Sequence, residues 1–188
     1  MVRAPVTVEQ VRDLVASGRL RSGAGLELVA GVLLAAPPPG AAVVALVTEL
    51  AAALDRLLPD HRVAVREAVA VGERDLLRPE VALVRPLWTG GDGAWTRRAT
   101  AGYPPADALA LAVFVGESEA PLRWRATRCA RAGVPEAWTI ALGDASASRW
   151  RCPAQGRYQR RDPLPPGEPV APDVAPDRFV VAWRRPAR

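Results

Sequence analysis

Lysine is absent from this 188-residue sequence, so all 25 of its basic residues are arginine. The pKa of arginine lies above about 12, so its guanidinium group stays charged and does not transfer protons in proteins. The absence of lysine excludes an amine catalyst and a P-loop nucleotide site, because both require a lysine side chain. A GC-rich genome would account for the arginines together with the many Ala, Gly, Pro and Val residues.

Metal-binding and membrane-spanning patterns are also scarce. The only histidine is His61, and the two cysteines, Cys129 and Cys152, have no CxxC spacing. Such a set excludes a typical zinc site, and we expect both thiols to be buried and free. No apolar run approaches the roughly 20 residues of a membrane helix, and residues 1–5 lack a signal-peptide pattern. We therefore expect a cytoplasmic protein with no membrane partner.

The positive charge is concentrated in the last third of the chain. Residues 1–122 carry a net charge of −2, whereas residues 123–188 carry +7. A cationic surface attracts nucleic-acid phosphates through counterion release, without reading the base sequence. A basic surface that only faces solvent, in a protein of arginine-rich composition, would show the same charge distribution.

Hydrophobic periodicity in the first half predicts alternating helices and strands. Thr7 and Gln10 have the spacing of a helix capping box, and the Ala30-Gly31 pair separates two short apolar runs. From Arg62 to Val71 the apolar residues recur every second position, as in a strand with one buried face. The expected elements are a helix at residues 8–16, a hairpin of strands 26–29 and 32–35, a helix at 41–58, and strands at 62–71 and 79–86.

The second half continues this alternation within one predicted domain, residues 1–188. Residues 87–105 are rich in glycine and proline and are expected to form a loop that carries Trp88 and Trp95. Residues 106–115 are almost entirely apolar, which is typical of a strand covered on both faces. The remaining expected elements are a helix at 120–132 that ends at Gly133, strands at 136–142, 148–152, 157–160 and 178–183, and a proline-rich connection at 163–176.

Several segments together resemble the Uma-two family, which belongs to the PD-(D/E)XK nuclease superfamily. Residues 130–138 read ARAGVPEAW, close to the family's ARAGVPEYW, and residues 26–33 are similar to its YELIDGELV hairpin. Residues 78–81 stand where the family has QPDL, residues 6–10 match its opening helix, and residues 37–39 precede the long helix as in the family. The resemblance implies a PD-(D/E)XK restriction-endonuclease-like core, which is an α/β fold with a mixed β-sheet flanked by helices, here with a β-rich C-terminal extension.

The resemblance also implies metal-dependent hydrolysis of DNA phosphodiesters. In this superfamily two carboxylates hold a divalent metal, usually Mg²⁺, and a lysine stabilises charge. Glu80 matches the first carboxylate and Glu27 matches a glutamate at or beside the metal, whereas the second carboxylate falls on Phe114. Arg125 takes the lysine's place; it keeps the positive charge but cannot act as a base. Glu117 lies just past the second strand and is the candidate for a relocated metal ligand.

Three interpretations therefore remain open. The chain is an active Mg²⁺-dependent endonuclease with a relocated acid such as Glu117 or Glu67, or it is a degenerate member that needs no cofactor, or it is a structural or protein-binding module. A degenerate member would bind phosphate through the helical arginines, which are Arg123, Arg125, Arg128 and Arg131. The resemblance implies DNA as a non-specific partner and a homodimer as the assembly.

Overall fold

The computed structural model describes residues 5–21, 25–36, 38–86 and 103–184. Its helices are α1 (Val8–Ala16), α2 (Ala41–Leu57), the 3-10 turn η1 (Ala106–Ala108) and α4 (Glu119–Arg131). The strands of the first half are β1 (Leu26–Val29), β2 (Val32–Ala35), β3 (Arg62–Val65), β4 (Val69–Gly72), β5 (Asp75–Leu77) and β6 (Val81–Val84). Those of the second half are β7 (Leu109–Gly116), β8 (Glu136–Ala141), β9 (Ser146–Ala154), β10 (Arg157–Pro163), β11 (Pro169–Val170) and β12 (Val180–Val181).

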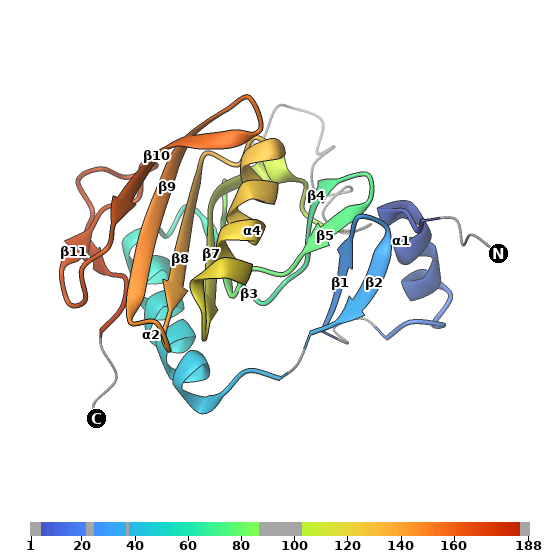
Figure 1. Cartoon of the computed structure of the whole chain (residues 1–188), viewed down its shortest axis with the longest axis horizontal. Helices are drawn as coiled ribbons and strands as arrows, with labels where there is room; N and C mark the ends of the chain where they lie inside the picture. The colour runs from blue at the N-terminus through green and yellow to red at the C-terminus, as the bar shows by residue number, and fades with distance from the viewer. Residues whose placement is uncertain (1–4, 22–24, 37, 87–102, 185–188) are drawn as a thin grey trace.

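A mixed six-stranded sheet forms the centre of the molecule, in the order β10-β9-β8-β7-β6-β3. Strands β7 and β8 are parallel, and every other neighbouring pair is antiparallel. Helix α4 connects the two parallel strands and lies over one face of the sheet, as Figure 1 shows. All residues of β7 except Gly116 are buried, which confirms the prediction of a strand covered on both faces.

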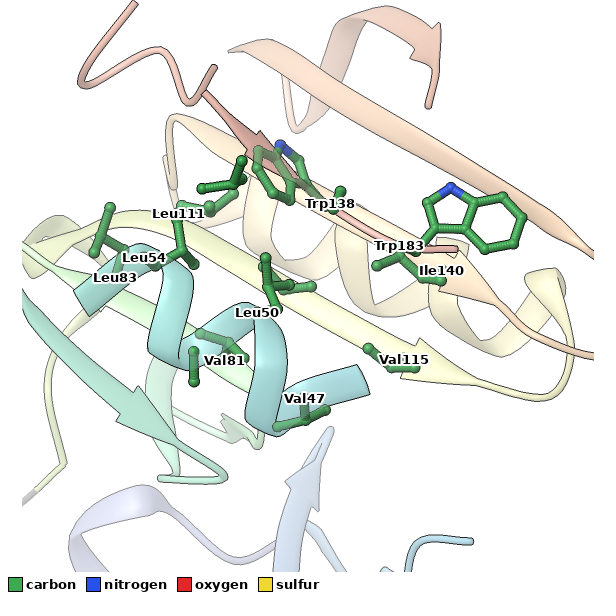
Figure 2. Close-up of a cluster of buried hydrophobic side chains, with 14 of the residues drawn as sticks. Val47, Leu50, Leu54, Val81, Leu83, Leu111, Val115, Trp138, Ile140 and Trp183 are labelled. Atoms are coloured by element: carbon green, nitrogen blue, oxygen red, sulfur yellow. The ribbon is translucent and has the colours of Figure 1, made fainter. Parts of the chain in front are cut away.

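The two faces of β7 belong to separate apolar clusters. Leu111, Val113 and Val115 face α2 and the end of the chain, where Trp183 is fully buried (Figure 2). Ala112 and Phe114 point the other way, into a cluster with α4 residues such as Leu122 and Cys129. The alternation follows from the period of two in a strand. It places Phe114 beneath α4.

The hairpin β1–β2 belongs to a second, antiparallel sheet of order β2-β1-β5-β4, against which α1 packs. The predicted capping box of α1 is present, because the Gln10 backbone N–H donates to Thr7 Oγ1 and the Thr7 backbone N–H donates to Gln10 Oε1. Figure 1 shows this part at the right of the six-stranded sheet. The predicted hairpin and both long helices are confirmed, with α2 ending at Leu57 rather than residue 58.

The prediction of one strand from Arg62 to Val71 is wrong. The backbone of Arg66 adopts a left-handed conformation, with φ of 54°, and the chain leaves the six-stranded sheet at that point. Strand β3 therefore pairs with β6, whereas β4 pairs with β5 in the other sheet. The apolar alternation continues across the break because both strands bury one face, so periodicity alone does not reveal it. Strand β5 was also missed.

Other boundaries differ in smaller ways. Residues 106–108 form a 3-10 turn before β7, and the last predicted strand is reduced to two residues that pair with β11.

Cys129 is buried and its burial raises the pKa of the thiol to about 12, but Cys152 is exposed, so the expectation of two buried thiols is half wrong. Trp88 and Trp95 of the predicted loop lie outside the described residues. No helix in the described ranges has the length and apolar character to cross a membrane.

Candidate functional site

A cavity of about 230 Å³ opens where β6 begins, between the two sheets, the start of α2 and helix α4. Its charged lining consists of three acids and three arginines, which are Glu27, Glu80, Glu117, Arg66, Arg78 and Arg125. The structure thus brings together Glu27, Glu80, Glu117 and Arg125, for which the resemblance implies catalytic or metal-binding roles, but not Glu67, the other candidate for a relocated acid. Those roles stay predictions, because side-chain proximity alone does not establish chemistry.

Strand β7 holds Glu80 through both its backbone and its side chain. Its backbone N–H donates to the Val113 carbonyl oxygen at 2.9 Å, and its Oε2 accepts from the Val115 N–H at 2.9 Å. The residue is only 7% exposed. Burial raises the pKa of the Glu80 carboxyl, while the Val115 hydrogen bond and the charges of Arg125 and Arg66 oppose that shift. Its carboxyl group is therefore fixed in place at a cavity that charged side chains line in part.

Glu27 and Arg125 form an ion pair across the cavity. Arg125 Nη2 donates to Glu27 Oε2 at 2.9 Å, and the Arg78 backbone N–H donates to Glu27 Oε1 at 3.1 Å. The side chains of Glu27 and Arg125 are 8% and 22% exposed, so the pair is largely removed from water. Both carboxylate oxygens of Glu27 thus have protein donors, which reduces their capacity to accept a further ligand.

Phe114 fills the position at which the resemblance expects the second carboxylate. Its side chain is fully buried, and the guanidinium carbon of Arg125 lies 6.0 Å from the centre of its ring. A cation above an aromatic face is attracted by the ring quadrupole. The Phe114 ring therefore lies at the outer limit of a cation–π contact with Arg125, and it occupies the place of a charged group with an apolar one.

These residues do not fit a divalent metal ion. Mg²⁺ requires oxygen ligands and is usually held by one or two carboxylates that are free to bind it. Here Glu27 is bound to Arg125, Phe114 offers no ligand atom, and the nearby arginines repel a cation. Within the described ranges, no three His, Cys, Asp or Glu side chains are close enough together to hold a metal.

The two candidates for a relocated acid have different positions. Glu117 lines the cavity but is exposed, and its Oε2 lies beside the turn at Gly143, 3.3 Å from where a Cβ on that glycine would stand. Its carbonyl oxygen accepts from the Gly143 and Asp144 N–H groups, which fixes its backbone. Glu67 lies outside this cavity and is paired with Arg62.

The helical arginines fall into two groups. Arg128 donates to Asp75 at 2.9 Å and lies over the Trp124 ring at 4.9 Å, and Arg125 is bound to Glu27 as described above. Arg123 and Arg131 are exposed, and neither forms an ion pair with any residue that the structure describes. The free cationic surface of α4 therefore consists of Arg123 and Arg131.

Sequence reasoning missed two arginines of the cavity, Arg66 and Arg78. Arg78 Nε donates to the Arg66 carbonyl oxygen at 2.6 Å, and the Arg66 N–H donates to the Glu80 carbonyl oxygen at 3.1 Å. These bonds tie the break between β3 and β4 to the start of β6. The position of Arg78 directly before Pro79 and Glu80 could have indicated that it lies at the site. Nothing in the sequence indicates the left-handed turn at Arg66.

Comparison with known proteins agrees with this fold. Residues 8–184 match the model of a family described as "Uma2: Putative restriction endonuclease". A crystal structure of a putative nuclease belonging to DUF820, from Anabaena variabilis ATCC 29413, is similar with a TM-score of 0.68. The likeness covers 95% of this chain and 96% of that chain at 14% sequence identity, and it confirms the predicted fold class. No curated protein matches the sequence.

Proposed function

This chain belongs to the Uma2 family of putative restriction endonucleases, and we propose that it is a nuclease-fold protein that binds DNA phosphates without cleaving DNA. The observation that carries the proposal is Phe114, fully buried under Arg125 where the resemblance implies the second carboxylate. Metal-dependent phosphodiester hydrolysis depends on ligands that fix the ion's coordination. Phe114 supplies no carboxylate, and Glu27 is bound to Arg125. Two of the implied metal ligands are therefore missing or occupied.

Phosphate binding is supported by the charges that remain unpaired. Arg123 and Arg131 are exposed on α4, and Arg66 lines the cavity without an ion pair in the described part of the chain. Arginine binds phosphate through a planar set of N–H donors and releases counterions from the DNA. The predicted outcome is binding that is independent of sequence and that weakens steeply as salt is added.

A second candidate function is an active endonuclease in which Glu117 serves as the relocated acid. The observation in its favour is that Glu117 and Glu80 line the same cavity. The exposed side chain of Glu117 can rotate, whereas Glu80 is held by the Val115 N–H. The two candidates differ in whether plasmid DNA is cut.

A cleavage assay separates these candidates. Supercoiled plasmid is incubated with the protein and Mg²⁺ or Mn²⁺, beside the Glu80→Ala and Glu117→Ala variants at matched concentration. We expect the wild-type protein to nick no faster than the two variants. Nicking that both substitutions abolish would overturn the proposal and establish the active endonuclease.

A binding assay tests the positive part of the proposal. Fluorescence anisotropy with a labelled duplex at several salt concentrations is measured for the wild type and the double variant Arg123→Ala, Arg131→Ala. Removing two phosphate contacts should weaken binding and reduce the slope of log K against log salt by about 2. Arg56→Ala is the matched control, because Arg56 is also an exposed helical arginine but lies on α2. Absence of binding at low salt would favour a protein-interaction module.

A further inference from the structure

A second cavity of about 330 Å³ adjoins the first one. It lies between α1, the start of β1 and the connection from β3 to β4, and Arg66 and Arg78 line both cavities. The two arginines are joined by a hydrogen bond from Arg78 Nε to the Arg66 carbonyl oxygen. A ligand in one cavity would therefore contact the same two arginines as a ligand in the other.

The lining of this second cavity is mostly apolar. Its aliphatic residues are Val11, Val15, Leu20, Leu26, Val65, Ala68 and Leu76. Val65 is 50% exposed, so the apolar surface is open to water at that edge. The half-buried side chain of Tyr103 adds one aromatic ring. Open apolar surface beside a ring favours a flat, weakly polar ligand.

The charges around this surface favour an anionic group on the same ligand. Glu67 is the only acid in the lining, and Arg62 neutralises it through hydrogen bonds at 2.5 and 3.3 Å. Arg21, Arg66 and Arg78 also line the cavity, and none of them has an ion pair among the described residues. The uncompensated charge of the cavity is thus positive.

We propose that this second cavity receives one unpaired nucleobase of a DNA single strand, with the adjoining phosphate at Arg66 and Arg78. A base provides the flat ring for Tyr103, and its phosphate provides the anion for the arginines. A base within a duplex cannot enter a cavity of this size unless its pairing and stacking are broken. This inference rests on the proposed function, and it defines the preferred ligand as single-stranded DNA or DNA with unpaired bases.

The test compares two single strands that carry the same number of phosphates, which are labelled (dT)12 and a 12-residue abasic strand. Both strands, and a 12-base-pair duplex that carries twice as many phosphates, are titrated against the full chain at one salt concentration. We expect (dT)12 to bind about tenfold more tightly than the abasic strand, since stacking of a base on an aromatic side chain contributes about that factor. Thymidine 5′-phosphate should displace (dT)12 at concentrations at which deoxyribose 5-phosphate does not.

The variant Tyr103→Ala should remove most of the difference between (dT)12 and the abasic strand, whereas Arg123→Ala with Arg131→Ala should weaken both ligands equally. The ligand series needs no variant, so the test stands even if Tyr103→Ala fails to fold.

Equal binding of the (dT)12 and abasic strands would overturn the base cavity and leave phosphate binding intact. Absence of all DNA binding at low salt would overturn both proposals. If Tyr103→Ala turned a dimer into a monomer in sedimentation velocity, the cavity would belong to a second copy of the chain, which would also overturn the base cavity.

Discussion

Glu80 and Glu136 are two buried glutamates at the starts of strands in the same sheet, but their surroundings differ. The Glu136 carboxylate accepts hydrogen bonds from Trp138 Nε1 at 2.6 Å, from Arg149 Nε at 2.5 Å and from the Asp173 N–H at 2.7 Å. Glu80 accepts one bond from the Val115 N–H and opens into a cavity lined by arginines. Both residues are buried acids, and of the two it is Glu80 that lines a cavity formed by described residues.

The difference separates a structural network from a candidate binding site. Around Glu136 the network extends through Arg149 to Asp173 and through Arg151 to Asp162, so most donors and acceptors are matched within the protein. A fully satisfied polar network makes a region rigid and specifies one packing arrangement. These internal ion pairs also neutralise part of the positive charge in the last third of the chain. Arginines without an ion pair among the described residues include Arg123 and Arg131 on α4, and Arg66 and Arg78 at the two cavities.

The largest expected effect is the loss of stability on replacing Glu136. In Glu136→Ala, the half-buried Arg149 keeps only Asp173 as its partner, and the buried Trp138 indole N–H loses its acceptor. Removing one partner of a buried ion pair costs about 3 to 5 kcal/mol. Urea unfolding monitored by tryptophan fluorescence measures this cost. Glu168→Ala is the control, because Glu168 is exposed in the same part of the chain and should change stability by less than about 0.5 kcal/mol. If both variants lost the same small amount, the Glu136 network would not be structural.

A smaller loss is expected at Glu27. The variant Glu27→Ala leaves Arg125 and the Arg78 N–H without their acceptor, which should cost about 2 kcal/mol, since Arg125 retains 22% exposure to water. A double-mutant cycle with Arg125→Ala isolates the pair, and we expect the two losses to be non-additive by about 1 kcal/mol or more. Additive losses would show that the ion pair contributes nothing specific, and that Glu27 is available to a ligand.

The sequence predicted the helices, the hairpin and the buried strand because each has a strong local signal, such as the Thr7 and Gln10 capping box or the all-apolar residues 109–115. It did not reveal the division into two sheets, since the left-handed turn at Arg66 leaves the apolar alternation unbroken. The meeting of Glu27, Glu80 and Arg125 was expected only from the family resemblance. The partners within that cluster are non-local, 98 residues apart for Arg125 and Glu27, and local patterns do not encode such pairings.

The smallest expected effect concerns the pH dependence of stability at Glu80. Because burial raises the pKa of this carboxyl above its ordinary value of 4.5, the folded protein holds the proton more tightly than the unfolded chain. Stability linked to Glu80 is therefore complete below pH 4.5 and is lost as the pH rises through the folded pKa. Glu80→Gln stays neutral and can still accept from the Val115 N–H, so its stability relative to the wild type should increase between pH 4 and pH 7. Urea unfolding at both values measures this difference, with the exposed Glu117→Gln as control. A difference that stays constant or falls would mean that the Val115 hydrogen bond and the charges of Arg125 and Arg66 balance or outweigh burial, so that the cavity holds an ionised carboxylate.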